Sequence, residues 1–349
     1  MRSGLHNAKS QRMKGKIALL DNFEGKEAAA LLIDGKLHDF FTEPGMKAPG
    51  AIFRVKVKHQ LKGSGGVFVE SPDGDFFLHQ TSSITPGKFI LVQVSSYGDS
   101  EKLPRVSTKL LFKSRYVIVT PFADGLNIAK SIQDIERKSQ LKQLVTEGFE
   151  HIPYGMILRS ACASASDNEI IDDCRNMINA AQNVLSDENN QIGLIYRAQS
   201  PHQMAWREWS DIPTVDKRNG VFSDYGVLEL IDELKDSKVI INNSNYYIEP
   251  TRAFVAIDVN TGGDMSFAAG LKANLAMAKD LPRQLRLRGL GGQVVIDPAP
   301  MSRQNRKTLE NAIKSSLRRD IIETNFVGWT SMGLIELQRA RIRPNWLTL

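Results

Sequence analysis

The segment from Arg252 to Asp297 constrains the fold of this chain more than any other. Ala253 to Ile257 form an apolar strand-like run that ends in Asp258, Val259 and Asn260, and a second run over 293–296 ends in Asp297. A helical pattern over about 268–288 separates the two runs. Strand, helix and strand of these lengths predict a βαβ unit with parallel strands, whose carboxyl ends lie at one edge of the sheet, where such sheets bind ligands.

The polar residues at this predicted edge suit a metal ion. Side chains alternate along a strand, so Asp258 and Asn260 should project to the same side while Val259 turns inward. Two carboxylates and one amide can then converge, and Mg²⁺ is often held by one or two carboxylates together with waters and phosphate oxygens. The alternative is that each aspartate caps the loop or helix that follows its strand.

Positive charge is concentrated near the end of the chain. The 349 residues carry a net charge of +6, and the span from Arg283 to Arg343 alone holds 12 Lys and Arg against five Asp and Glu. Such a local excess is typical of a face that binds a polyanion, which favours phosphate-rich partners. The alternative is a set of solvated helix faces over 307–323.

Composition and length indicate two or three ordinary globular domains. Hydrophobic residues make up 42% of the chain and charged residues 24%, which excludes a disordered or fibrous protein. The basic, polar start has no signal-like apolar region, and no window resembles a membrane span, so we expect a cytoplasmic protein that begins at Met1 or Met13. Cys162 and Cys174 are expected to be reduced core residues.

Local patterns predict the order of elements. Strands are expected over 16–20, 28–33 and 36–41, with Asp34-Gly35 as a type I′ hairpin turn. Short strands over 52–58, 66–71, 75–79 and 89–95 are typical of a small Greek-key barrel. Helices are expected over 130–149, from the capping box of Ser166 and Glu169 to about 186, and over 226–235, whereas 200–224 shows no clear period and is predicted to be a loop or linker.

Several motifs resemble the RNase E/G family of endoribonucleases. They are Glu249-Pro250-Thr251-Arg252-Ala253, Ala256-Ile257-Asp258-Val259-Asn260-Thr261, Asn274-Leu275-Ala276, Arg283-Gln284-Leu285-Arg286-Leu287-Arg288, Leu290-Gly291-Gly292, Val295-Ile296-Asp297 and Met332-Gly333-Leu334-Ile335-Glu336-Leu337 with Arg339 and Arg341. The order of these motifs is specific, and the likeness covers most of the chain.

The resemblance implies an α+β multidomain fold. An RNase H-like subdomain with a 5′-end pocket would comprise 1–42 and 112–198, with an S1-like (OB-fold) RNA-binding β-barrel inserted at 43–111. A linker at 199–240 would lead to a DNase I-like α/β catalytic subdomain at 241–349. The zinc-linking cysteine pair and the long tail of the family are absent from this sequence, so no structural zinc is expected, and a homo-oligomer, if formed, should not be zinc-linked.

The implied activity is Mg²⁺-dependent cleavage of single-stranded RNA that leaves 5′-phosphates, in RNA processing or decay. Asp258 and Asp297 match the metal-binding aspartates, and Asn260 matches the asparagine that orients the attacked phosphate. Mn²⁺ is expected to substitute for Mg²⁺. The arginines Arg283, Arg286 and Arg288 are predicted to position the RNA backbone.

Two further RNA sites follow from the resemblance. Arg159 and Ser160 match a pocket for the RNA 5′-monophosphate, although an arginine paired with a surface acid is the plain alternative. Phe68 and Phe77 match aromatics that stack bases, and Lys102 matches a lysine that contacts RNA. Barrel aromatics are more often core residues, which is the alternative for the two phenylalanines.

The sequence also departs from the family pattern. Ser114 stands where the 5′-phosphate pocket usually has glycine, Pro298 follows Asp297 where a second acid is usual nearby, and Pro282 is expected to interrupt the helix before Arg283. A non-catalytic RNA-binding relative with a degraded metal site is therefore the main alternative. A deoxyribonuclease or other phosphoesterase on a similar scaffold is a third.

Overall fold

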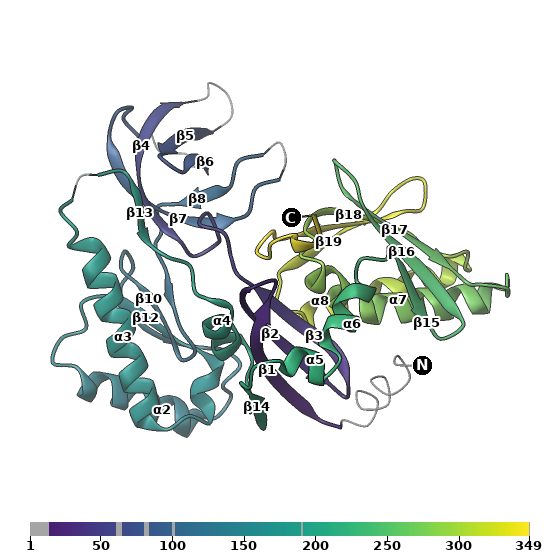
Figure 1. Cartoon of the computed structure of the whole chain (residues 1–349), viewed down its shortest axis with the longest axis horizontal. Helices are drawn as coiled ribbons and strands as arrows, with labels where there is room; N and C mark the ends of the chain where they lie inside the picture. Colours follow the sequence, from purple (N-terminus) through teal and green to yellow (C-terminus); the bar gives the residue numbers. More distant parts are fainter. Residues whose placement is uncertain (1–13, 61–64, 80–83, 100–101, 190, 349) are drawn as a thin grey trace. The chain divides into compact units, whose positions relative to one another are not determined.

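The computed structural model describes residues 14–60, 65–79, 84–99, 102–189 and 191–348. Met1 and Met13, the two candidate starts, lie outside these residues. The chain forms two compact units (Figure 1): one combines residues 1–42 with 212–349, and the other comprises 43–211. Each unit is described by itself below.

The first unit begins with a small antiparallel sheet. Its strands are β1 (Lys16–Phe23), β2 (Lys26–Ile33) and β3 (Lys36–Thr42), and β14 (Thr214–Asp216) adds to β1 in parallel. The predicted Asp34-Gly35 turn is confirmed, since both residues have positive φ, 49° and 74°. Helices α5 (Val221–Asp224) and α6 (Val227–Glu233) supply Val221, Phe222 and Ile231 to the core beneath this sheet.

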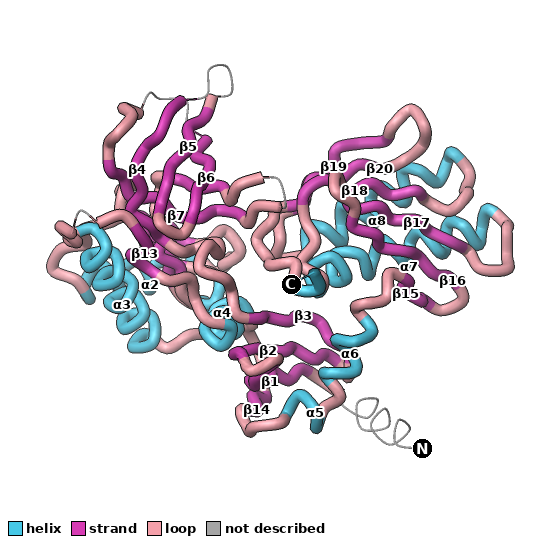
Figure 2. Tube along the Cα trace, turned by 45° about the horizontal axis from the view of Figure 1, so that its top comes forward, coloured by secondary structure: helices cyan, strands magenta, loops and turns pink. Residues whose placement is uncertain are grey.

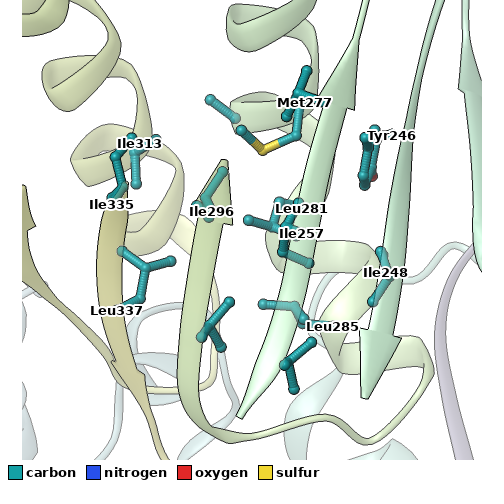
Figure 3. Close-up of a cluster of buried hydrophobic side chains, with 14 of the residues drawn as sticks. Tyr246, Ile248, Ile257, Met277, Leu281, Leu285, Ile296, Ile313, Ile335 and Leu337 are labelled. Atoms are coloured by element: carbon teal, nitrogen blue, oxygen red, sulfur yellow. The ribbon is translucent and has the colours of Figure 1, made fainter. Parts of the chain in front are cut away.

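The first unit also contains a six-stranded sheet in the order β15-β16-β17-β18-β20-β19. The strands are β15 (Lys238–Ile241), β16 (Ser244–Pro250), β17 (Val255–Asn260), β18 (Gly292–Asp297), β19 (Thr324–Trp329) and β20 (Ile335–Arg339). β17, helix α7 (Phe267–Leu287) and β18 form the predicted parallel βαβ unit. α7 and α8 (Arg306–Arg319) cover one face of the sheet (Figures 1 and 2), and the core between them includes the residues shown in Figure 3.

The prediction that Pro282 interrupts helix α7 is wrong, because the helix continues through this residue. Pro282 removes one backbone donor, but Leu281 and Leu285 on either side of it are fully buried in the core of the unit. Burial of this helix face offsets the missing hydrogen bond.

The second unit contains a closed five-stranded barrel, as predicted. Its strands are β4 (Ile52–Gln60), β5 (Gly66–Ser71), β6 (Gly74–His79), β7 (Phe89–Ser96) and β8 (Arg105–Ser107), and β4 pairs with both β5 and β7. β13 (Gly193–Tyr196) pairs with the first residues of β4, 52–54, while β5 pairs with 56–60. The mixed α+β class and the barrel, which is consistent with an OB or S1-like fold, agree with the sequence prediction.

The rest of the second unit is a small sheet covered by helices. Its strands are β9 (Phe112–Lys113), β10 (Val117–Thr120), β11 (Leu126–Ile128) and β12 (Gly155–Leu158), and its helices are α2 (Ile135–Gly148), α3 (Asp167–Leu185) and α4 (Pro201–Glu208). The predicted capping box of Ser166 and Glu169 opens α3. Cys162 and Cys174 are free and buried, and burial raises the pKa of each thiol to about 12.

The segments 1–42 and 112–198, predicted to belong to one subdomain, build separate sheets. Residues 1–42 share a sheet with β14 and a core with α5 and α6, whereas 112–198 builds a separate sheet in the other unit. The segment 199–240, predicted to be a linker, contains α4, β14, α5 and α6. Ser200 and Gln203 form a capping box that starts α4, and Pro201 occupies its first turn. Among the described residues, no helix is long and apolar enough to cross a membrane.

Candidate functional site

Asp258 and Asp297 lie side by side at the carboxyl ends of two parallel strands. They are register partners, meaning that they stand directly opposite each other on β17 and β18. The neighbouring Ile257 and Ile296 point into the core (Figure 3), so both aspartates project from the other face of the sheet, where they are exposed. The structure therefore brings together the two carboxylates singled out from the sequence.

Asn260 completes this group. It lies two residues beyond Asp258 on the same face of β17, and its Nδ2 donates a hydrogen bond of 2.9 Å to Asp258 Oδ2. This contact fixes the orientation of the Asp258 carboxylate and leaves the Asn260 amide oxygen beside it.

The electrostatics of the pair suit a cation. Partial burial and then the negative charge of Asp258 raise the pKa of Asp297 above its ordinary value. In the part of the chain that the structure describes, no three His, Cys, Asp or Glu residues cluster as a metal site. The donor set fits Mg²⁺ or Mn²⁺, because hard cations accept one or two carboxylates and complete their coordination with water and phosphate oxygens.

The barrel places Phe68 and Phe77 on its outer surface. They are register partners on β5 and β6, their rings contact each other edge to face at 5.9 Å, and both are partly exposed. The alternating residues Val67, Val69 and Phe76 fill the barrel core instead. The two rings therefore lie outside the barrel core. The Phe77 ring packs over Gly66, where a methyl group would overlap it.

Lys102 lies in the turn that leads into β8. It is exposed, and its backbone N–H donates to Asp99 Oδ1 at 2.7 Å. Three residues later, Arg105 is the register partner of Phe77. A lysine and an arginine thus belong to the segment that continues into the strand beside the exposed ring.

The arginines at the end of α7 are mostly structural. Arg286 is buried, forms ion pairs with Asp320 and Asp39, and donates to the His38 carbonyl oxygen at 2.8 Å. Arg288 is also buried and donates to Gln284 and to the Asp236 carbonyl oxygen. An RNA contact needs an accessible guanidinium group, so this placement does not support the RNA-contacting role predicted for Arg286 and Arg288.

Arg283 is more accessible than Arg286 and Arg288. Its Nε pairs with Asp280 at 2.8 Å, its Nη1 donates to the Leu37 carbonyl oxygen at 2.7 Å, and about a quarter of the side chain remains exposed. It holds α7 against β3 while keeping part of its surface in solvent.

The predicted 5′-phosphate pocket contains a carboxylate that the sequence did not reveal. Arg159 follows β12, donates to the Ser114 carbonyl oxygen, and pairs through Nη2 with Glu208 Oε2 at 3.2 Å. Arg207 Nε contacts the other oxygen of Glu208 at 2.5 Å, and Ser160 is exposed beside Arg159. Glu208 ends α4, in the segment predicted to be a linker, so its approach to Arg159 could not be anticipated.

Ser114 and Lys113 are neighbours of Arg159 and Glu208. The Ser114 side chain is buried, and its hydroxyl lies 2.5 Å from Asp173 Oδ2. Lys113 is exposed along part of its length, but desolvation of its ammonium group and then the Arg207 cation lower its pKa. Three cationic side chains thus surround one carboxylate.

Comparisons with known proteins identify the family of this chain. The Ribonuclease E/G family model matches residues 112–216 and 203–342. Ribonuclease G of Escherichia coli is 25% identical over an alignment covering 94% of this chain and 80% of that protein, and Ribonuclease G of Haemophilus influenzae is 24% identical with the same coverage. Ribonuclease E of Nostoc sp. is 23% identical, covering 92% of this chain and 55% of the relative. The chain therefore belongs to the Ribonuclease E/G family.

Proposed function

We propose that this protein is an endoribonuclease that cleaves single-stranded RNA by Mg²⁺-dependent hydrolysis and leaves 5′-phosphate ends. The observation that carries the proposal is the register pair Asp258 and Asp297, exposed at the carboxyl edge of parallel strands. Membership of a family whose relatives are named ribonucleases supports RNA as the substrate.

Each residue of the group has a distinct task in this proposal. Asp258 and Asp297 would hold the cation, with Mn²⁺ as a substitute, and Asn260 would donate to or orient the attacked phosphate from beside Asp258. A bound Mg²⁺ supplies a water of lowered pKa and offsets the charge that develops on the phosphate. The partly exposed Phe68 and Phe77 would hold single-stranded bases, because stacking requires an accessible ring face.

The test compares cleavage and binding in the same variants. A labelled single-stranded RNA should be cut with Mg²⁺ and remain intact with EDTA. Asp258→Asn and Asp297→Asn should each lose most cleavage, because one carboxylate alone holds the cation poorly, while RNA affinity in EDTA stays near that of the unaltered protein. Calorimetric titration with Mn²⁺ should show weakened metal binding in both variants.

Glu229→Gln is the matched control, because Glu229 is an exposed carboxylate on α6, which packs against the small sheet and not the sheet that carries the two aspartates. It should cleave normally. Full activity in the double Asp258→Asn, Asp297→Asn variant would overturn the metal assignment. Binding without any cleavage by the unaltered protein would instead favour the non-catalytic relative, an alternative that the donor set of only two carboxylates keeps open.

A further inference from the structure

The two aspartates belong to a longer row of side chains across the sheet. Lys238 on β15 is the register partner of Tyr247 on β16, Tyr247 is that of Asp258, and Asp258 is that of Asp297. The row therefore crosses four neighbouring strands and spans about 14 Å.

All four side chains project from the face of the sheet opposite α7 and α8. Tyr246 and Ile248, which flank Tyr247 on β16, point into the core with Ile257 and Ile296 (Figure 3). Alternation along each strand then turns Tyr247 and Asp258 to the other face. The exposure of Lys238, Asp258 and Asp297 shows that solvent reaches this face.

Tyr247 and Lys238 carry the chemistry that single-stranded RNA requires. The Lys238 Nζ lies 5.8 Å from the centre of the half-buried Tyr247 ring, and no carboxylate among the described residues pairs with this ammonium group. Aromatic rings stack bases of any identity, and lysine neutralises backbone phosphates. A cation, an aromatic ring and the carboxylate pair thus follow one another in a single line.

We propose that Tyr247 and Lys238 form a subsite for the nucleotide next to the phosphodiester cleaved at Asp258 and Asp297. The base of this nucleotide stacks on Tyr247, and a neighbouring backbone phosphate contacts Lys238. Tyr247 stands one strand spacing, about 5 Å, from Asp258. A base stacked on Tyr247 therefore holds the adjoining phosphate beside Asp258 and Asp297. This inference rests on the proposed function, and it makes Tyr247 and Lys238 positioning residues.

The test couples a protein change to an RNA change. An RNA with one cleavage site is made as a series in which each nucleotide near that site is abasic in turn, and affinity is measured in EDTA. Tyr247→Ala should weaken binding of intact RNA by about 5-fold or more, and Tyr247→Phe should bind normally. At one position beside the cleavage site, the abasic substitution should have no further effect in Tyr247→Ala, since the base has lost its partner.

Two controls separate this subsite from general binding. Phe254→Ala removes a partly exposed ring just before β17, at the opposite end of the strand from Asp258, and should leave the abasic series unchanged. Lys238→Gln should lower the slope of log affinity against log salt concentration by about one, the signature of one lost phosphate contact.

The outcomes are distinguishable from failure of the proposed function. If Tyr247→Ala and every abasic substitution act additively, the subsite is refuted, even where cleavage still depends on Asp258. If the unaltered protein cuts no RNA but Tyr247→Ala and one abasic substitution are coupled, Tyr247 still binds a base, and it is the catalytic proposal that fails. Lowered thermal stability of Tyr247→Ala with unchanged affinity would return Tyr247 to a structural role.

Discussion

Glu208 determines how Arg159 can meet a phosphate. Its carboxylate pairs with Arg159 and Arg207 at once, and all three side chains are about a fifth to a quarter exposed. A terminal phosphate can therefore bind Arg159 fully only if it competes with this carboxylate. The pocket should nevertheless favour anions, because Lys113, Arg159 and Arg207 outnumber Glu208.

We expect a modest preference for 5′-monophosphorylated over 5′-hydroxyl RNA, of about 1 to 2 kcal/mol for a charge-assisted hydrogen bond. Arg159→Ala should abolish it. Glu208→Gln should increase it, since the amide keeps the shape of the side chain but removes the competing charge. The measurement is the ratio of kcat/KM for two RNAs that differ only in the 5′ group.

Glu147→Gln, an exposed acid at the end of α2, is a suitable control and should leave the ratio unchanged. Equal cleavage of both RNAs by the unaltered protein and by Glu208→Gln would show that Arg159 has only a structural role.

A second residue, Asp320, joins the buried arginines of the first unit. Its carboxylate pairs with Arg286 and, at 2.7 Å, with Arg339, and all three side chains are at most 5% exposed. Removing one partner of a buried ion pair leaves an uncompensated charge. Asp320→Asn should therefore lower the free energy of unfolding by about 3–5 kcal/mol, measured by urea denaturation.

The exposed pair of Asp232 and Lys235 provides the comparison, at 2.9 Å. Asp232→Asn should change stability very little, because solvent screens the pair. A similarly small effect of Asp320→Asn would mean that Arg286 and Arg339 find other compensation.

At the scale of elements, the β5–β6 hairpin should act as a base-binding platform. Phe68→Ala or Phe77→Ala should weaken binding of single-stranded RNA by about 1–3 kcal/mol, because each ring offers one stacking surface. Fluorescence anisotropy in EDTA measures this without cleavage. Phe89→Ala, which removes another exposed ring of the barrel at the start of β7, should bind RNA as the unaltered protein does. Equal losses in all three variants would indicate a general effect on the barrel.

Local signals in the sequence were sufficient for most elements. The period-two strands, the Asp34-Gly35 turn and the Ser166 capping box act over a few residues, and the structure contains all of them. The predicted βαβ unit also placed Asp258 and Asp297 at one edge, because the carboxyl ends of parallel strands lie at the same edge of a sheet.

Long-range pairing could not be inferred in the same way. The sequence around Arg286 alone predicts an exposed cation. Arg286 can be buried because Asp39 and Asp320, from distant segments of the chain, pair with it. Glu208 reaches Arg159 across 49 residues of sequence, and Tyr247 gains its significance from the partners on either side of β16. Such neighbours are determined by tertiary packing rather than by local pattern.

At the scale of the whole molecule, one unit is inserted into the other. In the first unit, one hydrophobic core lies within 239–337 and another combines residues from 17–40 and 221–347. The two described cores of the second unit lie within 51–198. No described core cluster draws on both units. The first unit is therefore built from two chain segments, which need to meet before β14 can pair with β1.

This arrangement predicts that the first unit folds without the inserted one. Thr42 ends β3 and Ile212 precedes β14, and the sheet order β14-β1-β2-β3 places these ends about 25 Å apart. A flexible linker of about 20 Gly and Ser residues has this average span. A chain joining 1–42 to 212–349 through it should unfold in one cooperative urea transition followed by circular dichroism. Introducing Asp320→Asn into this chain should weaken it as in the full protein, since the buried pairs lie within the unit. A gradual transition without cooperativity would show that the first unit depends on residues 43–211 for its stability.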